Sequence, residues 1–269
     1  MQHINSDPRA KIDENLVRHV VLNSLRSYIK QFKSKYGTVV IACDSKKYWR
    51  RDYFPFYKAN RRKEREKSDF DWTYIFECFN KIREELKQNF PYRVIEVEGA
   101  EADDVIAVLT QTYSNNEDVL ILSSDKDFVQ LQKMKNVQQY SPILKRFIQT
   151  DDPDMFVKEH IIRGDRSDGV PNILSPDNTF VVGERQKSIN KVRLAEWMKS
   201  EPDEFCVNES MKRGYKRNQM LVDLTFIPED IRNKIIQTYE TTKPANKMTM
   251  MSYLMEKRLK SLIEIADEF

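Results

Sequence analysis

Acidic side chains follow several short apolar segments of this sequence, each at the point where the segment ends. They are Asp44, Glu101, Asp103, Asp125 and Asp127, with Asp165 and Asp168 further along the chain. One carboxylate at the start of a helix is explained by capping and by the helix dipole. Carboxylates gathered from separate segments repel one another, so they stay ionised only beside cations. The set therefore predicts a site for Mg²⁺ or Mn²⁺, with a pair of ions acting on a phosphoryl group.

Other common kinds of site are disfavoured by residue type and spacing. The nitrogen and sulfur ligands that zinc prefers are scattered along the chain, namely His3, His19, His160, Cys43, Cys78 and Cys206. Cysteines placed in this way indicate reduced thiols inside a cell. The six glycines form no Gly-Xaa-Gly, which argues against a dinucleotide or P-loop fold. We interpret His160, on an apolar helix face, as a structural residue.

The spacing of the acids restricts where each can lie. Residues two apart in a regular helix point about 200° away from each other. For Glu101 and Asp103 to face one ion, Glu101 must lie in the loop or cap before the helix and Asp103 in its first turn. Asp125 and Asp127 need extended or turning backbone, which the end of a strand supplies. Asp104, taken alone, is interpreted as a helix-capping residue.

Apolar runs typical of strands alternate with helical patterns in the first half of the chain. Strands are expected at 38–43, 93–97, 119–122, 136–140 and 146–150, and helices at 13–35, 72–89 and 102–113. This alternation predicts an α/β fold with a central parallel sheet and flanking helices. Ligands of such sheets bind beyond the carboxyl ends of the strands, where the acids lie.

From about residue 152 the strand patterns stop and helical patterns follow. We expect helices at 154–163, 189–200, 203–213, 228–241 and 247–267. The sequence therefore predicts two domains, an α/β domain over residues 1–150 and a helical domain over residues 151–269.

Basic and aromatic side chains are concentrated in residues 46–67. Ten basic and three acidic residues give this segment a charge of +7, while the whole chain of 269 residues carries only +3. Such a patch is typical of proteins that bind a polyanion, because basic groups neutralise phosphates and aromatic rings stack on unpaired bases. The alternative is a solvated helix whose aromatic rings pack in the core. The predicted nucleic-acid contacts are Lys46, Lys47, Tyr48, Trp49, Arg50, Arg51, Lys58, Arg61 and Arg62.

Membrane insertion and secretion are not expected. No apolar run approaches the roughly 20 residues that cross a bilayer, and the N-terminus lacks the pattern of a signal peptide. We expect a cytoplasmic protein that does not bind membranes.

Three acidic motifs, taken in order, resemble those of a known family. Glu-Ala-Asp-Asp at 101–104, Ser-Ser-Asp-Lys-Asp-Phe at 123–128 and Gly-Asp-Arg-Ser-Asp at 164–168 are similar to motifs of the flap endonuclease, or 5′-nuclease, superfamily. Lys-Tyr-Trp-Arg-Arg-Asp at 47–52, Phe-Ile-Pro-Glu-Asp-Ile at 226–231 and the closing Asp-Glu-Phe resemble the ribonuclease H group of T-even bacteriophages within it. The likeness runs from about residue 13 to residue 269.

The resemblance implies a PIN-like nuclease domain followed by a helical domain that grips duplex DNA. It implies two Mg²⁺ ions, with Mn²⁺ as a substitute, held by Asp44, Glu101, Asp103, Asp125, Asp127, Asp165 and Asp168, the first five of them catalytic. The implied reaction is 5′→3′ hydrolysis of phosphodiesters near the 5′ ends of RNA or DNA, and segment 46–67 matches the arch that engages such ends. Substrates would be RNA–DNA and DNA–DNA duplexes with 5′ ends or flaps, including primers in phage DNA replication.

The resemblance also implies a setting. It implies a monomer in the cytoplasm of an infected bacterial host cell, with a phage single-stranded DNA-binding protein and a sliding clamp as partners.

Two departures from the family pattern suggest an alternative function. Family members begin with an apolar strand that ends in a further metal-binding Asp, whereas here Asp7 follows a polar segment, so that first strand is expected to be absent. The stretch 170–178 lacks the Gly-Ile-Gly turn of many members, so no monovalent-cation site is expected there. The alternative is an impaired or truncated relative that binds branched or nicked DNA without cleaving it. A toxin-like ribonuclease is disfavoured, because such domains are usually shorter and lack the helical half.

Overall fold

The computed structural model describes residues 13–68 and 70–269, apart from the side chains of residues 62–64. The expectations about His3, Asp7 and a missing first strand therefore lie outside the described residues, as does the side chain of Arg62. The chain divides into two compact units. One contains the described residues up to 41 together with 70–95 and 239–269, and the other contains 42–68 and 96–238.

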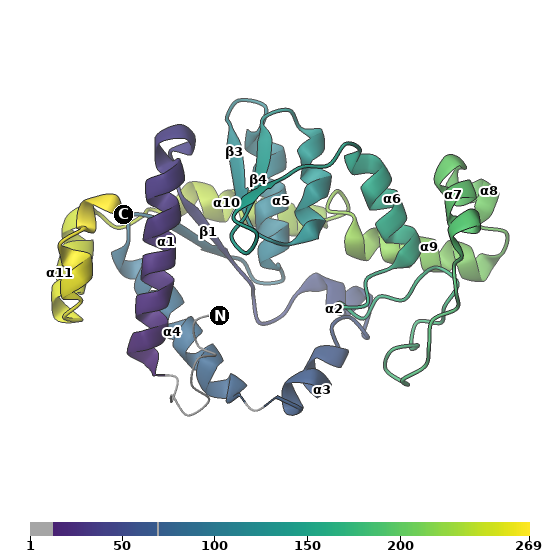
Figure 1. Cartoon of the computed structure of the whole chain (residues 1–269), viewed down its shortest axis with the longest axis horizontal. Helices are drawn as coiled ribbons and strands as arrows, with labels where there is room; N and C mark the ends of the chain where they lie inside the picture. Colours follow the sequence, from purple (N-terminus) through teal and green to yellow (C-terminus); the bar gives the residue numbers. More distant parts are fainter. Residues whose placement is uncertain (1–12, 69) are drawn as a thin grey trace. The chain divides into compact units, whose positions relative to one another are not determined.

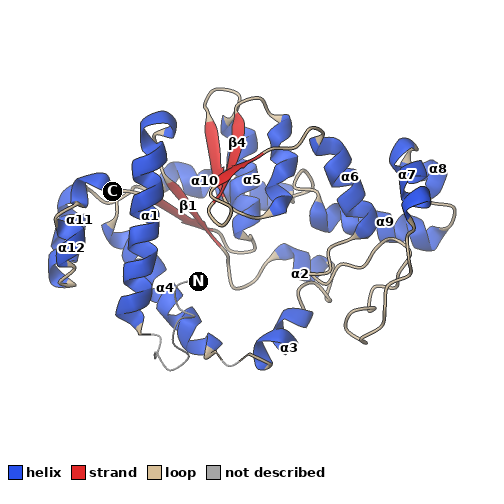
Figure 2. Ribbon diagram, viewed as in Figure 1, coloured by secondary structure: helices blue, strands red, loops and turns tan. Residues whose placement is uncertain are grey.

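The strands form two small sheets, drawn in red in Figure 2. β1 (Val40–Cys43) pairs with β2 (Arg93–Glu96), and β4 (Val137–Ser141) lies between β3 (Val119–Leu122) and β5 (Arg146–Ile148). β3 and β4 are parallel, whereas β4 and β5 are antiparallel. The α/β fold is confirmed, but the sheet is smaller than expected and not wholly parallel. The four-residue turn between β4 and β5 is too short for a parallel crossover, which needs about a dozen residues.

The unit that contains the C-terminus is mainly helical. Its elements include α1 (Glu14–Tyr36), α4 (Trp72–Asn89), α11 (Lys247–Glu256), α12 (Lys260–Ile263) and the 3₁₀ helix η2 (Ala266–Glu268). α1 packs against α4 and η2, and Phe90 contacts the rings of Tyr92, Tyr253 and Phe269. The single helix expected over 247–267 is wrong. The helix ends at Glu256. Two residues later, Arg258 has a positive φ of 54°, which a helix does not accommodate.

The second unit carries the remaining helices around the three-stranded sheet. They are α2 (Trp49–Tyr53), α3 (Asn60–Glu66), α5 (Ala102–Tyr113), the 3₁₀ helix η1 (Lys126–Lys133), α6 (Pro153–Arg163), α7 (Lys191–Lys199), α8 (Pro202–Phe205), α9 (Glu209–Val222) and the start of α10 (Glu229–Thr241). α6 packs against η1, α7 and α9, and Figure 1 labels α6, α7 and α9. Ile161, Ile162, Ile173, Phe205 and Tyr215 belong to the core between them. The helix expected over 203–213 is wrong, because α8 ends at Phe205 and Asn208 caps α9.

Backbone pairing beyond the strand ends brings distant segments together. The amide of Ser45 donates to Ala100 O at 3.0 Å and the amide of Trp49 donates to Gly99 O at 2.9 Å. The chain that leaves β1 therefore runs beside the chain that leaves β2, up to the start of α5. In the other sheet the amide of Ser123 donates to Tyr140 O at 3.1 Å. The pairing of β3 with β4 therefore continues one residue beyond the end of β3, close to Asp125. Among the described helices, none is both long and apolar enough to cross a bilayer.

Candidate active site

Three of the predicted acids meet at the N-terminus of α5. Glu101 is the N-cap of this helix and Asp103 lies in its first turn, as the spacing predicts. Asp44, from the end of β1, accepts a hydrogen bond from the amide of Ala102 at 2.8 Å. Asp104 accepts one from the amide of Glu101 at 2.9 Å and completes a capping box, which agrees with its interpretation as a structural residue. Free amides and the helix dipole favour negative charge at this position.

The acids after β3 lie on turning backbone. Asp125 is the N-cap of η1, and its Oδ1 accepts a hydrogen bond from the amide of Asp127 at 3.0 Å. The amide group of Gln139, which is fully buried, donates to the carbonyl of Asp125 at 2.6 Å. Asp127 therefore points from the first turn of η1 while Asp125 caps it, which is the turning geometry that the spacing requires.

Asp165 and Asp168 lie in a tight loop that follows α6. Gly164 ends α6 with a positive φ of 67°, and the backbone of Val170 and Pro171 leaves no room for a Cβ there. The loop therefore folds back onto the helix end. Asp168 accepts hydrogen bonds from Tyr57 Oη at 2.9 Å and from Arg61 Nη2 at 2.5 Å, which ties this loop to the basic segment.

Acids from three of these places share one pocket. Its lining comprises Asp103, Asp127, Asp165, Asp168, Arg50, Tyr57, Val170, Leu221, Val222 and Leu224. Glu101 is buried, while Asp44 and Asp125 are exposed. The charge of Asp125 nevertheless acts on Asp103. The structure thus gathers four of the seven predicted acids around a pocket. The other three lie at the N-terminal ends of α5 and η1, the helices that carry Asp103 and Asp127.

Two of the pocket acids are difficult to ionise. Burial raises the pKa of Asp103 to about 7, the charges of Glu101 and Asp125 act in the same direction, and Lys58 opposes them. Burial also raises the pKa of Asp127 to about 6, opposed by His160. Burial would raise the pKa of Asp165 too, but hydrogen bonds from His160, Ser167 and Lys126 hold it well below its ordinary value. Asp103 and Asp127 are therefore the carboxylates with the strongest need for an added cation.

Side chains of the protein itself neutralise other acids of the site. Arg50 forms ion pairs with Glu101 at 2.9 Å and with Asp104 at 2.8 Å, and Lys58 Nζ lies 2.6 Å from Glu101. Burial would lower the pKa of Lys58, but the charges of Asp168 and Glu101 keep it above its ordinary value. Glu101 is thus balanced from within the fold, and so are Asp165 by Lys126 and Asp168 by Arg61. The unmet negative charge of the pocket therefore lies on Asp103 and Asp127.

The basic segment lies at the acid site, but its members have different roles. Lys46, Lys47 and Arg51 are exposed. Arg50 was predicted to contact nucleic acid, yet it is only 2 % exposed and fully engaged inside the fold, so we remove it from that set. Lys58 and Arg61 are half-buried and paired with acids.

The aromatic residues of this segment are mostly packed. Phe54 and Tyr57 are buried against Val170 and Leu221, as the core-packing alternative predicts for them. Trp49 is half-buried, and its indole Nε1 donates to Asp104 at 3.1 Å. Tyr48 is half-buried with its ring edge-on to Tyr57 and Arg51 over its face. Stacking on bases by these two side chains stays a prediction.

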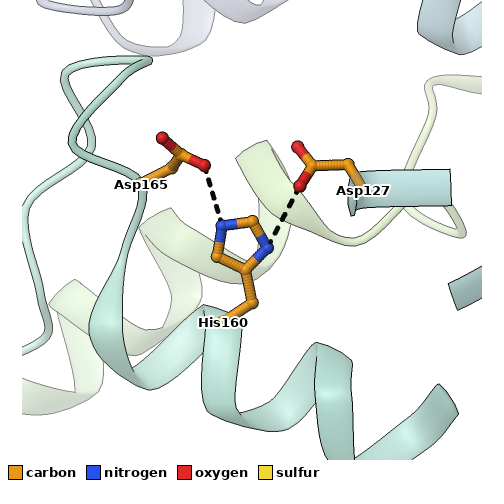
Figure 3. Close-up of side chains that lie close together, drawn as sticks. All are labelled: Asp127, His160 and Asp165. Carbon is orange, nitrogen blue, oxygen red and sulfur yellow. Dashed lines mark hydrogen bonds and ion pairs between the residues drawn. The ribbon is translucent and has the colours of Figure 1, made fainter. Parts of the chain in front are cut away.

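His160 was not expected at the site. It lies in the last turn of α6, where its Nε2 is 2.9 Å from Asp165 Oδ2 and its Nδ1 is 3.4 Å from Asp127 Oδ1 (Figure 3). The sequence interpretation placed it on an apolar face of the helix. Its separation of five residues from Asp165 was the available signal, because a residue just past a helix end folds back on the last turn.

Comparison with known proteins agrees with this arrangement. The family described as "5'-3' exonuclease, N-terminal resolvase-like domain" matches residues 9–161, and that described as "T4 RNase H, C terminal" matches residues 151–269. The ribonuclease H of Enterobacteria phage T4 is 35% identical, over 99% of this chain and 90% of that protein. The chain belongs to the 5′-3′ exonuclease family. As a member of that family it is a nuclease, with a resolvase-like N-terminal domain and a helical C-terminal domain.

Solved structures support the fold of this family member. A bacteriophage T5 5′-exonuclease with bound zinc aligns with a TM-score of 0.66 and 18% identity, over 90% of this chain and 94% of that one. A T5 flap endonuclease in complex with DNA and metal ions aligns with a TM-score of 0.58 and 19% identity, over 81% and 91% of the two chains. At these identities the likeness concerns the fold.

Proposed function

We propose that this family member is a Mg²⁺-dependent 5′→3′ nuclease, which hydrolyses phosphodiesters near the 5′ ends of RNA and DNA. The observation that carries the proposal is the pocket lined by Asp103, Asp127, Asp165 and Asp168 beside the basic segment. Asp103 and Asp127, the pocket acids that burial makes hardest to ionise, lie next to a surface that attracts phosphates, and this arrangement suits metal-assisted phosphoryl transfer. In this proposal the α/β domain over residues 1–150 carries the chemistry and the helical domain over 151–269 holds duplex DNA.

The pocket suits a hard divalent cation on the chemistry of its donors. Its charged ligand atoms are mainly carboxylate oxygens, and Asp127 Oδ1 is buried without a hydrogen-bond partner. Asp103 and Asp127, together with Asp44 and Asp125, would hold the ions directly or through water. Bound Mg²⁺ or Mn²⁺ supplies polarisation of the phosphate and a hydroxide nucleophile. The ion pairs of Arg50 and Lys58 keep Glu101 in place behind these ligands.

Removal of divalent metal is expected to abolish cleavage, because no metal ion then offsets the charge of Asp103 and Asp127 or activates water. The assay follows short products released from a 5′-labelled flap and from an RNA–DNA duplex, first in EDTA and then after Mg²⁺ or Mn²⁺ is restored. Asp125→Asn and Asp127→Asn are each expected to lower the rate by about 10- to 100-fold while DNA binding survives. Full activity of both variants, or cleavage in EDTA, would refute the metal assignment.

Exposed cations of the basic segment are proposed to bind the nucleic-acid backbone. Replacing Lys46, Lys47 and Arg51 together by Ala is expected to weaken binding and to reduce the slope of log K against log salt by about 2 to 3, at about 0.7 to 0.9 per charge. Fluorescence anisotropy of a labelled flap over a salt series measures this slope. The control replaces three exposed lysines of the other compact unit, Lys87, Lys243 and Lys260. Equal slopes for both triple variants would show that the segment is not the binding surface.

The alternative is a relative that holds branched or nicked DNA without cleaving it. The ion pairs of Lys58, Arg61 and Lys126 with site acids favour it, because they already neutralise part of the negative charge. Salt-dependent binding without cleavage in Mg²⁺ or Mn²⁺ would support this alternative, and cleavage by pure protein that is lost in Asp127→Asn would exclude it.

The biological setting is part of the proposal. We place the enzyme in phage DNA replication inside an infected bacterial cell, where it removes primers and flaps as a monomer beside a single-stranded DNA-binding protein and a sliding clamp. The 35% identity to the phage T4 ribonuclease H supports this setting.

A further inference from the structure

His160 connects two of the site acids through its two ring nitrogens. Asp127 comes from the first turn of η1, His160 from the last turn of α6, and Asp165 from the loop after it (Figure 3). The imidazole is 7 % exposed. Asp165 lies on its Nε2 side and Asp127 on its Nδ1 side. The two carboxylates differ sharply in how well they are satisfied.

Asp165 has a complete set of hydrogen-bond donors. Its Oδ1 accepts from Ser167 N at 2.8 Å, from Ser167 Oγ at 2.5 Å and from Asp168 N at 3.2 Å. Its Oδ2 accepts from His160 Nε2 at 2.9 Å and pairs with Lys126 Nζ at 3.0 Å. A carboxylate offers about four lone-pair positions, so little capacity remains for a metal ion. The resemblance implies that Asp165 is a metal ligand, and its contacts here suit a carboxylate that orients His160.

The Nδ1 side of the ring is different. His160 Nδ1 and Asp127 Oδ1 are both buried and, within the described chain, neither has a hydrogen-bond partner. In the tautomer that donates its Nε2 proton to Asp165, the ring presents a lone pair at Nδ1. That lone pair faces a carboxylate oxygen 3.4 Å away. Two buried acceptors at this distance are stable only with a proton or a cation between them.

We propose that His160 Nδ1 and Asp127 Oδ1 are ligands of a first-row transition metal ion of the Zn²⁺ or Co²⁺ class, and that Asp165 orients the imidazole. Ligands about 2.0 to 2.1 Å from a tetrahedral ion are separated by about 3.3 to 3.4 Å, which matches the 3.4 Å measured here. A carboxylate on the other ring nitrogen is the usual partner of a metal-bound histidine. Imidazole suits Zn²⁺ and related ions, whereas Mg²⁺ prefers oxygen.

This inference rests on the proposed function, because it assigns a metal class to one position of the same pocket. Asp103 and Asp168 line that pocket and provide further oxygen donors. The position beside Asp103 remains one for an oxygen-preferring ion. The enzyme would then hold two unlike ions, one with a nitrogen ligand and one without.

The test begins with the unsubstituted full chain. The protein is stripped with EDTA and loaded with one equivalent of Co²⁺ for visible absorption, and with one equivalent of Cu²⁺, another ion that imidazole binds well, for pulsed electron paramagnetic resonance. The expected results are the intense ligand-field bands of four-coordinate Co²⁺ and a nitrogen coupling to Cu²⁺ from a directly bound imidazole. Neither measurement depends on the folding of a variant. Absence of both the nitrogen coupling and the Co²⁺ bands would overturn the proposal and leave the cluster as an ion pair.

Variants then separate the roles of the three side chains. His160→Gln keeps a donor for Asp165 but has no nitrogen lone pair, and it is expected to weaken Zn²⁺ binding by more than about 100-fold and to remove the nitrogen coupling. Asp165→Asn is expected to weaken Zn²⁺ binding by about 10- to 100-fold and to retain the coupling. Competition with a chromophoric chelator measures both affinities, and thermal unfolding monitors the fold. Unchanged Zn²⁺ affinity in folded His160→Gln would overturn the proposal.

The same proteins distinguish this proposal from the proposed function. Mg²⁺-supported cleavage by the parent, without loss of Zn²⁺ affinity in His160→Gln, would overturn the metal assignment of His160 and leave the nuclease proposal standing. A nitrogen-ligated ion in a protein that cleaves nothing with Mg²⁺, Mn²⁺, Zn²⁺ or Co²⁺ would support the site and refute the nuclease proposal.

Discussion

Asp103→Asn is expected to reduce cleavage on the order of 10³-fold and, in the metal-free protein, to increase stability at pH 8. The rate falls because a neutral amide cannot hold a divalent ion, which contributes several kcal/mol to the transition state. Stability rises because burial, and then the charges of Glu101 and Asp125, raise the pKa of Asp103 to about 7. Its ionisation at pH 8 therefore destabilises the folded state, and the amide removes that cost.

The pH dependence follows from the direction of this shift. A carboxyl group whose pKa rises on folding binds its proton more tightly in the folded state, so stability falls as pH rises from the ordinary pKa through about 7. The advantage of Asp103→Asn should be small at pH 4 and reach about 1 to 3 kcal/mol at pH 8, after allowance for partial solvation. Urea unfolding in EDTA at both pH values measures it. Added Mg²⁺ should stabilise the parent more than the variant.

Asp118→Asn is the matched control, because Asp118 is exposed in the loop before β3. It should change neither the cleavage rate nor the difference in stability between the two pH values. Parental cleavage by Asp103→Asn would remove this residue from the metal site. Lower stability of the variant at pH 8 in EDTA would contradict the effect of burial on its carboxylate.

The placement of the acids could be predicted because it depends on local rules. A strand that ends at residue 43 and a helix that begins at residue 102 place Asp44 and Asp103 at the same edge once β1 pairs with β2. The N-cap position of Glu101 followed from the angle between side chains in a helix. These predictions needed only the direction of the chain and the period of each element.

The partners of these acids could not be predicted, because they come from segments far away in the sequence. The sequence does not distinguish Arg50 from Arg51, since both are arginines of the same basic segment. Arg50 is nevertheless buried against Glu101, whereas Arg51 is exposed. Which face of α2 turns inward is set by the carbonyl of Leu221, 171 residues later. His160 was missed for the same reason, since Asp127 approaches it from another helix.

Short elements and the boundaries between helices were also missed. The 3₁₀ helix over Lys126–Lys133 begins at a capping Asp125, but its 8 residues are too few for their apolar spacing to identify a helix. The short helices α2 and α3 lie in the highly charged segment 46–67, where charge obscures the pattern. Between α8 and α9, Asn208 is of a residue type that caps helices and could have indicated a boundary. The prediction followed the apolar pattern instead and joined the two segments into one helix over 203–213.

Arg50→Met is expected to lower the free energy of unfolding by about 3 to 5 kcal/mol, the largest stability effect that the site predicts. The Arg50 guanidinium is buried, lies 2.9 Å from Glu101 and 2.8 Å from Asp104, and donates to Leu221 O at 3.0 Å. Methionine keeps much of the apolar stem and removes the charge. Two buried carboxylates and a carbonyl then each lose one donor, which costs more than the pairs contribute when intact. Lys58 remains paired with Glu101, and Trp49 Nε1 still donates to Asp104. Urea unfolding followed by circular dichroism measures the loss.

Arg51→Met provides the control on the same helix, because that side chain is exposed and its removal should change stability by no more than about 0.5 kcal/mol. Adding Asp104→Asn to Arg50→Met should recover part of the loss, since one of the unpaired charges disappears and the two changes are not additive. Asp104→Asn alone should destabilise the parent, because it removes a partner of Arg50 and weakens the capping box. A loss below about 1 kcal/mol for Arg50→Met would mean that water reaches Glu101 and Asp104, and that the interior of the site is less closed than the burial of Arg50 requires.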